Sequence, residues 1–240
     1  MIKFESISKK FGKLVVFDNL NLEIETSGIV SILGPNASGK TTLIKMLLGM
    51  VIPNSGKISI NDNSILKEWK YREQISYLPQ IAQFPDNLKV REVINLVKNI
   101  RNTNSKEDEL ISIFELEKSL DKKLNHLSGG TKQKVNLVLC FMFDTPIIIL
   151  DEPSNGLDPK ALVSLKDLII REKNNGKLVI LTTHIMSLVE ELSDRIVFLL
   201  EGNIVFDGTN IELISKYGEI NIERSLAKLL DYKNVENIKI

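Results

Sequence analysis

One eight-residue run constrains the fold of this chain more than any other feature of its sequence. The run fits the pattern G-x-x-x-x-G-K-[ST] without a mismatch. It consists of Gly34, Pro35, Asn36, Ala37, Ser38, Gly39, Lys40 and Thr41. A loop that wraps a polyphosphate closely needs glycine wherever a Cβ would collide, and its backbone N–H groups bind the anion together with the following helix N-terminus. The run therefore predicts a phosphate-binding loop in which Lys40 reaches the β- and γ-phosphates and the Thr41 hydroxyl ligates Mg²⁺.

The segments on either side of this loop favour the same interpretation over a glycine-rich turn without a ligand. Residues 28–33 are a short apolar run typical of a buried strand. Residues 40–48 place Leu43, Leu47 and Leu48 on one helical face. A phosphate loop joins such a strand to such a helix, so the context predicts the beginning of an α/β domain.

The rest of the chain alternates between sheet and helix periodicity. Strands are expected within residues 2–33, at 58–60 and at 75–78, and the period becomes helical from about 84 to 143. Further strands are expected at 147–150, 178–181, 196–200 and 204–206, with helices at 159–174, 186–193 and from 210 onward. We therefore expect an α/β chain with a helical insertion.

The composition limits the classes of function. With 31 basic and 31 acidic residues the chain has no net charge, which gives no electrostatic footprint for nucleic acid. Its single cysteine, Cys140, lies in an apolar run and cannot form an intrachain disulfide, which favours a reducing compartment and a core position. The N-terminus lacks the layout of a signal peptide, and no apolar stretch reaches the about 18 residues of a membrane span. We expect a soluble protein that needs a partner to act at a membrane.

A second run places two carboxylates at the end of an apolar strand. Residues 147–150 lead directly into Asp151 and Glu152. A buried strand delivers such side chains to the carboxyl edge of its sheet, where the ligands of α/β folds collect. Asp151 is suited to hold Mg²⁺, directly or through water, and Glu152 to polarise the attacking water as a general base. Alone, the pattern would describe a strand that meets solvent, but the phosphate loop favours the catalytic interpretation.

A third run, residues 127–130, opens a helix that we expect over 131–143. Ser128 is a natural N-cap, and Gly129 and Gly130 would let backbone N–H groups approach an anion. The alternative is a capped helix start with no ligand.

In order and spacing these motifs resemble the ATP-binding cassette family over residues 1–209. The resemblance rests on the phosphate loop, Gln80, residues 127–130, Asp151 with Glu152, residues 154–158, and His184. It implies an α/β fold with a P-loop NTPase core and a mixed sheet, an N-terminal antiparallel β subdomain and an inserted α-helical subdomain at about 84–143. Residues 1–209 would form the ATPase domain, and 210–240 a C-terminal helical extension.

The family's mechanism requires two cassettes that pair head to tail. ATP with Mg²⁺, bound at residues 34–41 and Thr42 of one cassette, would be capped by Ser128, Gly129 and Gly130 of the other. Asp158 matches the residue that crosses this dimer interface, although it would also serve as the N-cap before Pro159.

Three further residues match family positions outside these runs. Phe11 matches the aromatic residue that stacks on adenine. Gln80 matches the glutamine that senses Mg²⁺ and the membrane subunit, and His184 the switch histidine that contacts the γ-phosphate. The alternatives are a core residue for Phe11, a solvated residue for Gln80 and a loop residue for His184. His126 matches no motif and is expected at the surface.

Three positions depart from the family pattern. Ala37 stands where glycine is usual, and a positive φ at this position would cost ~1 kcal/mol or more. Thr131 replaces a common glutamine and Ser154 a common threonine. No group that touches phosphate or metal is lost, so we expect ATPase activity to persist.

The single cassette with a short helical insertion resembles the ATPase subunits of ABC-2-type export systems. Residues 33–50, 77–82 and 130–135 look most like the ATPase of nitrous-oxide-reductase maturation, which serves copper-site assembly with a membrane partner. With one Cys and two distant His residues, the chain itself is not expected to bind copper. The expected partners are an integral membrane permease and a second copy or a paralogous cassette. The expected location is cytoplasmic, on the inner face of the membrane through the permease.

Two other classes of nucleotide-binding protein differ from an exporter subunit in their sequence features. Soluble cassette ATPases of translation or DNA repair resemble paired cassettes with a linker, or cassettes split by a long coiled coil, and this sequence has neither feature. A nucleotide-binding module without catalysis would not require Glu152 or His184, and both are present.

Overall fold

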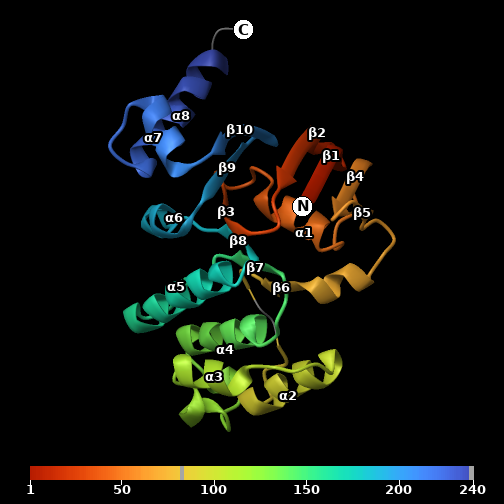
Figure 1. Ribbon diagram of the computed structural model, residues 1–240, viewed down its shortest axis with the longest axis vertical. Coiled ribbons are helices and arrows are strands. Elements are labelled where there is room, and N and C mark those ends of the chain that lie inside the picture. The colour runs from red at the N-terminus through yellow and green to blue at the C-terminus, as the bar shows by residue number, and fades with distance from the viewer. Residues whose placement is uncertain (82–83, 238–240) are drawn as a thin grey trace. The chain divides into compact units, whose positions relative to one another are not determined.

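The computed structural model describes residues 1–81 and 84–237 and divides into two compact units (Figure 1). Unit 1 contains Met1–Ile24, Gly28–Leu66 and Thr183–Ile240, and unit 2 contains Glu25–Ser27 and Lys67–Thr182. Ala82, which belongs to the stretch 77–82 used above, and the last three residues of the expected extension at 210–240 lie outside the described residues. The predicted domain boundaries stay a prediction.

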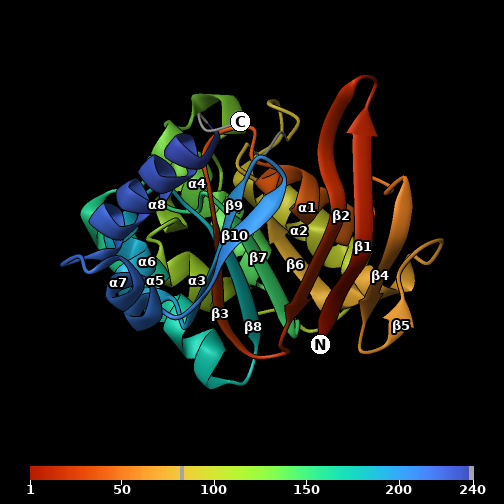
Figure 2. The ribbon, with the colours of Figure 1, turned by 90° about the horizontal axis from the view of Figure 1, so that it is seen from above.

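An antiparallel sheet occupies the N-terminal part of unit 1, as predicted (Figure 2). Its strand order is β2-β1-β4-β5. Leu20, Leu22 and Ile24 are all buried and alternate with exposed neighbours, so one face of β2 covers the core. The bounds are β1 (Ile2–Phe11), β2 (Leu14–Ile24), β4 (Ser55–Ile60) and β5 (Asn63–Ser64).

A second group of strands in unit 1 carries the phosphate loop. Strand β3 (Gly28–Leu33) runs parallel to β9 (Arg195–Leu200), and β10 (Asn203–Gly208) runs antiparallel to β9. The arrangement is therefore mixed, as expected. The loop leaves the end of β3 and leads into α1 (Lys40–Leu47).

Three C-terminal helices complete unit 1: α6 (Met186–Leu192), α7 (Asn210–Tyr217) and α8 (Ile222–Asn237). Ile222, Leu226 and Leu229 are buried in one cluster with residues of β3, β9 and α6, and Leu230 packs against it. The apolar stripe of the sequence is therefore a core face, which fastens the described part of the extension to unit 1.

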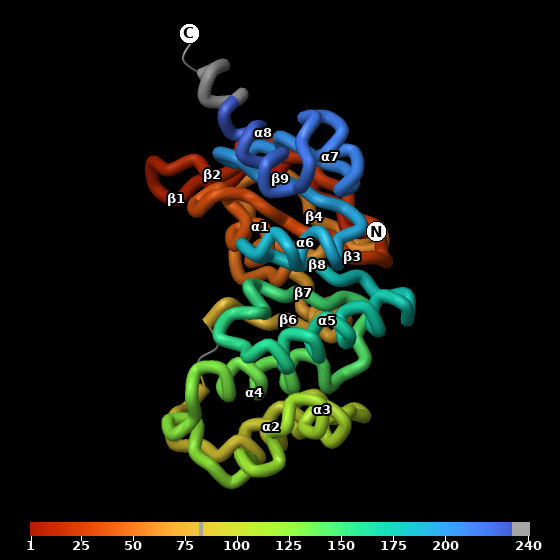
Figure 3. The backbone as a smooth tube through the Cα atoms, turned by 90° about the vertical axis from the view of Figure 1, so that its left-hand side faces the viewer, coloured from red at the N-terminus to blue at the C-terminus, as the bar shows by residue number. Residues whose placement is uncertain are grey.

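Unit 2 is a parallel three-stranded arrangement with helices packed on it. Its order is β8-β7-β6, with β6 (Ile75–Leu78), β7 (Ile147–Asp151) and β8 (Leu178–Thr182) in parallel register. Helix α5 (Pro159–Asn174) packs on β8 and α4 (Gly129–Phe141) on β6, while α2 (Val90–Arg101) and α3 (Glu107–Ile113) pack on α4 (Figure 3). Short 3₁₀ turns are η1 (Lys70–Gln74), η2 (Glu117–Ser119) and η3 (Leu124–His126).

Helix α4 begins earlier than the sequence predicted. Ser128 caps it by accepting a hydrogen bond from the Thr131 backbone N–H at 3.2 Å, which places Gly129 and Gly130 inside the first turn. The expected span 131–143 is therefore wrong by two residues at each end. Cys140 on this helix is buried, which confirms its core position, and His126 is exposed, as expected.

Candidate functional site

Two glycines of the phosphate loop have no room for a side chain. Gly34 has a φ of 147°, and a Cβ there would lie 2.1 Å from the Leu199 carbonyl oxygen. Gly39 has a φ of 109°, and its Cβ would lie 2.6 Å from the Phe17 ring. Because both positions combine positive φ with a close approach, the path of this loop requires glycine at each.

The third notable residue of the loop is Ala37, which stands where the family usually has glycine. Its φ is 64°, within the left-handed region. A Cβ in this conformation costs on the order of 1 kcal/mol relative to glycine. The loop therefore keeps the glycine-type backbone path although it carries an alanine.

The polar groups of the loop suit a polyphosphate. The Lys40 ammonium donates to the carbonyl oxygens of Gly34 and Pro35, the latter at 2.9 Å. Ser38 is 2% exposed, and its hydroxyl has no hydrogen-bond partner within the described residues. Helix α1 has no acidic residue in its first turn, where Thr41 is exposed and Thr42 half-buried. A buried hydroxyl, an ammonium group and an uncompensated helix N-terminus together fit a bound anion.

Two more predicted residues belong to unit 1. Phe11 is 48% exposed, so the core alternative for this residue is wrong. The Lys9 ammonium lies 4.7 Å from the centroid of its ring. His184 is exposed in the segment between β8 and α6, consistent with a loop position.

The carboxylates of unit 2 lie at the carboxyl end of β7, and both residues are buried. Thr182, opposite Asp151 in the strand register, donates its hydroxyl to Asp151 Oδ1 at 2.5 Å. The Glu152 backbone N–H donates to the Thr182 carbonyl oxygen at 3.0 Å. Glu152 has a φ of 52°, a conformation that costs on the order of 1 to 3 kcal/mol and that persists only where its surroundings impose it.

Thr182 was not among the predicted site residues. The signal that could have found it is its position at the end of the next buried strand, since parallel strands bring their carboxyl ends together. The Asp151 carboxylate also acts on Tyr77 of β6. Burial raises the pKa of Tyr77 to about 12, and the nearby charge of Asp151 contributes to the rise.

The two glycines of the turn before α4 differ in their surroundings. A Cβ on Gly130 would lie 2.4 Å from the Gly156 carbonyl oxygen, so packing within the chain requires glycine there. A Cβ on Gly129 would meet none of the described residues within 4 Å. The Ser128 hydroxyl lies 2.8 Å from that of Thr131 and is exposed. Gly129 and Ser128 therefore leave an open face on this turn.

Gln80 and Asp158 complete the predicted set in unit 2. Gln80 is exposed beyond the end of β6. Asp158 caps α5 by accepting from the Ala161 N–H at 2.9 Å, which confirms the capping interpretation. Its carboxylate also pairs with Lys134 at 2.7 Å, and that hydrogen bond is the largest cause holding the pKa of Asp158 below its usual range.

The predicted residues therefore divide between the units. Unit 1 contains Phe11, residues 34–42 and His184, while unit 2 contains Gln80, Ser128, Gly129, Gly130, Asp151, Glu152 and Asp158.

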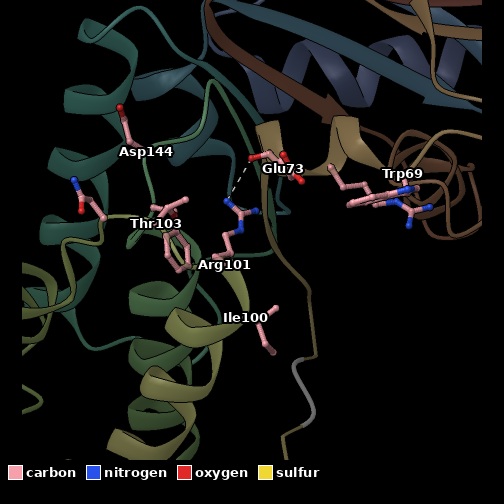
Figure 4. Close-up of a pocket in the computed structure, with 9 residues that line it drawn as sticks. Trp69, Glu73, Ile100, Arg101, Thr103 and Asp144 are labelled. Carbon is pink, nitrogen blue, oxygen red and sulfur yellow. Dashed lines mark hydrogen bonds between the residues drawn. The ribbon is translucent and has the colours of Figure 1, made fainter.

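A hollow of about 770 Å³ lies elsewhere in unit 2 (Figure 4). The Arg101 guanidinium stacks 5.0 Å from the Phe143 ring centroid and donates to the Ile75 carbonyl oxygen at 2.7 Å. Ile75 is the first residue of β6, and β6 is parallel to β7, which ends at Asp151. The hollow therefore lies at the opposite strand ends from the carboxylates and is not part of their site.

Comparisons with known proteins show the family and the fold of the chain. Residues 17–155 match the model of the family described as ABC transporter. The Nod factor export ATP-binding protein I of Burkholderia lata is 30% identical over 219 residues, which are 89% of this chain and 72% of the relative.

Two solved structures are similar to the chain over most of its length. A structure described as the ATP binding subunit of an ABC transporter has a TM-score of 0.88 at 28% identity, covering 96% of this chain and 99% of that one. The ATP-binding cassette MJ0796, in a dimeric post-hydrolysis state with ADP and Pi, has a TM-score of 0.77 at 25% identity, covering 87% and 98%.

Within residues 1–81 and 84–237, no helix is both long enough and apolar enough to span a membrane.

Proposed function

The chain belongs to the ABC transporter family, and from this premise we propose that it is the ATP-hydrolysing subunit of an export system. As a family member it is an ATPase. The observation that carries the proposal is that one chain contains both a loop suited to a polyphosphate and two adjacent buried carboxylates. The export direction is supported by the Nod factor export relative.

We assign nucleotide binding to unit 1. The Lys40 ammonium, which donates to the carbonyl oxygens of Gly34 and Pro35, would turn to the phosphates. The Ser38 hydroxyl, which has no partner in the described part of the chain, would gain one from the phosphates. Thr41 would ligate Mg²⁺ and Thr42 would support the phosphates from the first turn of α1, while Phe11 offers its exposed ring to the adenine.

We assign proton transfer to unit 2. ATP with Mg²⁺ supplies the phosphoryl group that water attacks and the metal charge that offsets the phosphate oxygens. Glu152 would accept the proton of the attacking water, and Asp151, fixed by the Thr182 hydroxyl, would hold the metal. Gln80 would complete the metal's surroundings, and His184 would donate a hydrogen bond toward the γ-phosphate.

We propose that two cassettes pair head to tail, either two copies of this chain or one copy and a paralogue. Ser128, Gly129 and Gly130 of one would then cap the nucleotide of the other, and Asp158 would lie at the interface. The open face on Ser128 and Gly129 supports this assignment, as does the dimeric state of the MJ0796 cassette. Neutral net charge supports the absence of nucleic acid from the partners.

The second proposed partner is an integral membrane permease, which would hold the chain on the cytoplasmic face of the membrane. We place its contact near Gln80 and the helices within residues 84–126. Leu96 and Ile100 on α2 support this placement because both side chains are exposed, Ile100 at 74%. Trp69, 66% exposed, lines the same hollow as Ile100.

Within the export class, the sequence resemblance favours the copper-processing system of nitrous oxide reductase maturation. Purification of the complex and identification of its membrane protein would test this proposal. Recovery of a drug or oligosaccharide exporter would contradict it, and the absence of any membrane protein would favour a soluble cassette ATPase.

ATP turnover of Glu152→Gln tests the proposed function. We expect a loss of at least a hundredfold in kcat, because the variant keeps the shape of the side chain but cannot accept the proton. We also expect this variant to form an ATP-dependent dimer, measured by size-exclusion chromatography with light scattering. Unchanged turnover would contradict the mechanism, and a monomer with ATP would contradict the head-to-tail pairing.

A further inference from the structure

The loop that follows Glu152, residues 153–158, is held by one face of α4. The first contact is a buried hydrogen bond in which Gln133 Nε2 donates to the Pro153 carbonyl oxygen at 3.0 Å. Gln133 is only 7% exposed, so this amide is removed from solvent. Asn136 Nδ2 lies 3.4 Å from Gln133 Oε1 and orients the amide so that its N–H groups face the loop.

Two more contacts reinforce this hold. Gly130 approaches Gly156 so closely that a Cβ would fall 2.4 Å from its carbonyl oxygen. Lys134 pairs with Asp158 at 2.7 Å, and its side chain is 17% exposed. Gln133 and Lys134 follow Gly130 by three and four residues, so each lies next to Gly130 on the helix surface.

The hydrogen bond from Gln133 has a consequence for Glu152. Glu152 has a φ of 52°, which a glutamate adopts only where neighbouring contacts impose it. Thr182 fixes the peptide on its N-terminal side through the Glu152 N–H, and Gln133 fixes the next residue through the Pro153 carbonyl. Glu152 is thus held on its N-terminal side by Thr182 and on its C-terminal side by the Asn155 N–H, which donates to the Glu152 carbonyl oxygen at 3.3 Å, while Gln133 holds the residue that follows.

We propose that Gln133 is a positioning residue, which through Pro153 holds the backbone of Glu152 in the conformation that presents its carboxylate to water. This inference rests on the proposed function of Glu152 as the general base. The same helix begins at Ser128, Gly129 and Gly130, so Gln133 and the turn assigned to cap a partner's nucleotide belong to one helix.

The test is steady-state ATP hydrolysis by Gln133→Met, a side chain of similar length that cannot donate a hydrogen bond. We expect kcat to fall about tenfold, since small displacements of a catalytic group have effects of this order, and KM for ATP to change less than twofold. Gln74→Met, the same change on an exposed glutamine of unit 2, is the matched control and should leave both constants unchanged.

A second measurement separates positioning from structural support. In the Glu152→Gln background, Gln133→Met should dimerise with ATP as well as Glu152→Gln alone, because the capping turn keeps its fold. The proposal is overturned if kcat of Gln133→Met matches the wild type, if the loss only follows the folded fraction measured by circular dichroism, or if dimerisation is lost. Absence of turnover in the wild-type protein would instead contradict the proposed function itself.

Discussion

The phosphate loop and the carboxylate end of β7 are built in opposite ways. In the phosphate loop, glycines at positions 34 and 39 shape the backbone, while the buried Ser38 hydroxyl lacks a partner within the described residues. At the carboxylates, the neighbouring groups are already in place, because Thr182 bonds both Asp151 and Glu152. The first region is thus prepared to receive a ligand, and the second to keep its own side chains in position.

This difference indicates that the proposed binding site and the proposed catalytic residues depend on different kinds of contact. The phosphate loop depends on local backbone conformation, so small residues within the loop decide its function. The carboxylates depend on contacts from β8 and α4, which are distant in sequence.

The largest expected effect comes from breaking the backbone of the phosphate loop. In Gly34→Ala the new Cβ would collide with the Leu199 carbonyl oxygen, and we expect a loss of stability on the order of 3 kcal/mol or more together with loss of ATP binding. Chemical denaturation and ATP titration measure both. Gly218→Ala is the control in the same unit, since it has a φ of 64° but an open surrounding, and should cost about 1 kcal/mol. Equal costs at the two positions would show that the close approach is unimportant.

The next largest effect is expected from removing a hydrogen bond at the carboxyl end of β7 while both carboxylates are kept. Thr182→Val keeps the shape of the side chain but removes the hydroxyl that bonds Asp151. We expect kcat to fall between about tenfold and a hundredfold, with ATP affinity changed less than threefold, because misplacing a catalytic group costs rate rather than binding.

Thr145→Val is the matched control for that change, since Thr145 is equally buried in unit 2 and bonds Ser76 at 2.9 Å. It should lower stability by about 1 kcal/mol and leave turnover unchanged. A similar loss of kcat in both variants would show that the Thr182 hydroxyl has no specific role in positioning Asp151.

A smaller effect is expected from removing the Ser38 hydroxyl of the phosphate loop. Ser38→Ala removes a hydroxyl that has no partner among the residues that the structure describes, so the stability without nucleotide should stay within about 0.5 kcal/mol of the wild type. ATP affinity should fall roughly three- to tenfold, the worth of one hydrogen bond of about 1 kcal/mol. Isothermal titration calorimetry measures the affinity. A large loss of stability with unchanged affinity would contradict a ligand-facing role.

The smallest effect concerns Ala37. Replacement by glycine relieves the left-handed strain at φ 64° but increases the freedom of the unfolded chain, so the net gain should be about 0.5 kcal/mol. Thermal unfolding measures this difference. A loss of stability would show that the Ala37 methyl group makes a packing contribution larger than its strain.

The contrast also explains how far the sequence could predict the molecule. Residues 159–174 and 75–78 were predicted with the bounds that the structure has, because their periodicity and end signals are local. Strand β5 and turn η1 were not predicted, since two and five residues carry no clear period.

In the candidate site, too, residues within local motifs could be predicted, whereas residues that act through long-range contacts could not. The phosphate loop could be predicted from the spacing of its glycines, lysine and threonine. A positive φ at Ala37 was considered from the sequence because glycine is usual there, and the structure has it. Thr182 and Gln133 were not predicted as site residues. Thr182 matters because of the register of β8 against β7, and Gln133 because its face of α4 contacts residues 153–158. Both are contacts between segments distant in sequence, which no local motif predicts.

The central claim is that the phosphate loop binds ATP while Glu152 acts in its hydrolysis. Paired measurement of the ATP dissociation constant and of turnover in Lys40→Met and Glu152→Gln tests it most directly. We predict that Lys40→Met loses affinity at least tenfold, whereas Glu152→Gln binds ATP within threefold of the wild type and turns over at most about a hundredth as fast. If Lys40→Met binds normally, or if Glu152→Gln hydrolyses ATP at the wild-type rate, the two regions do not have the roles assigned to them.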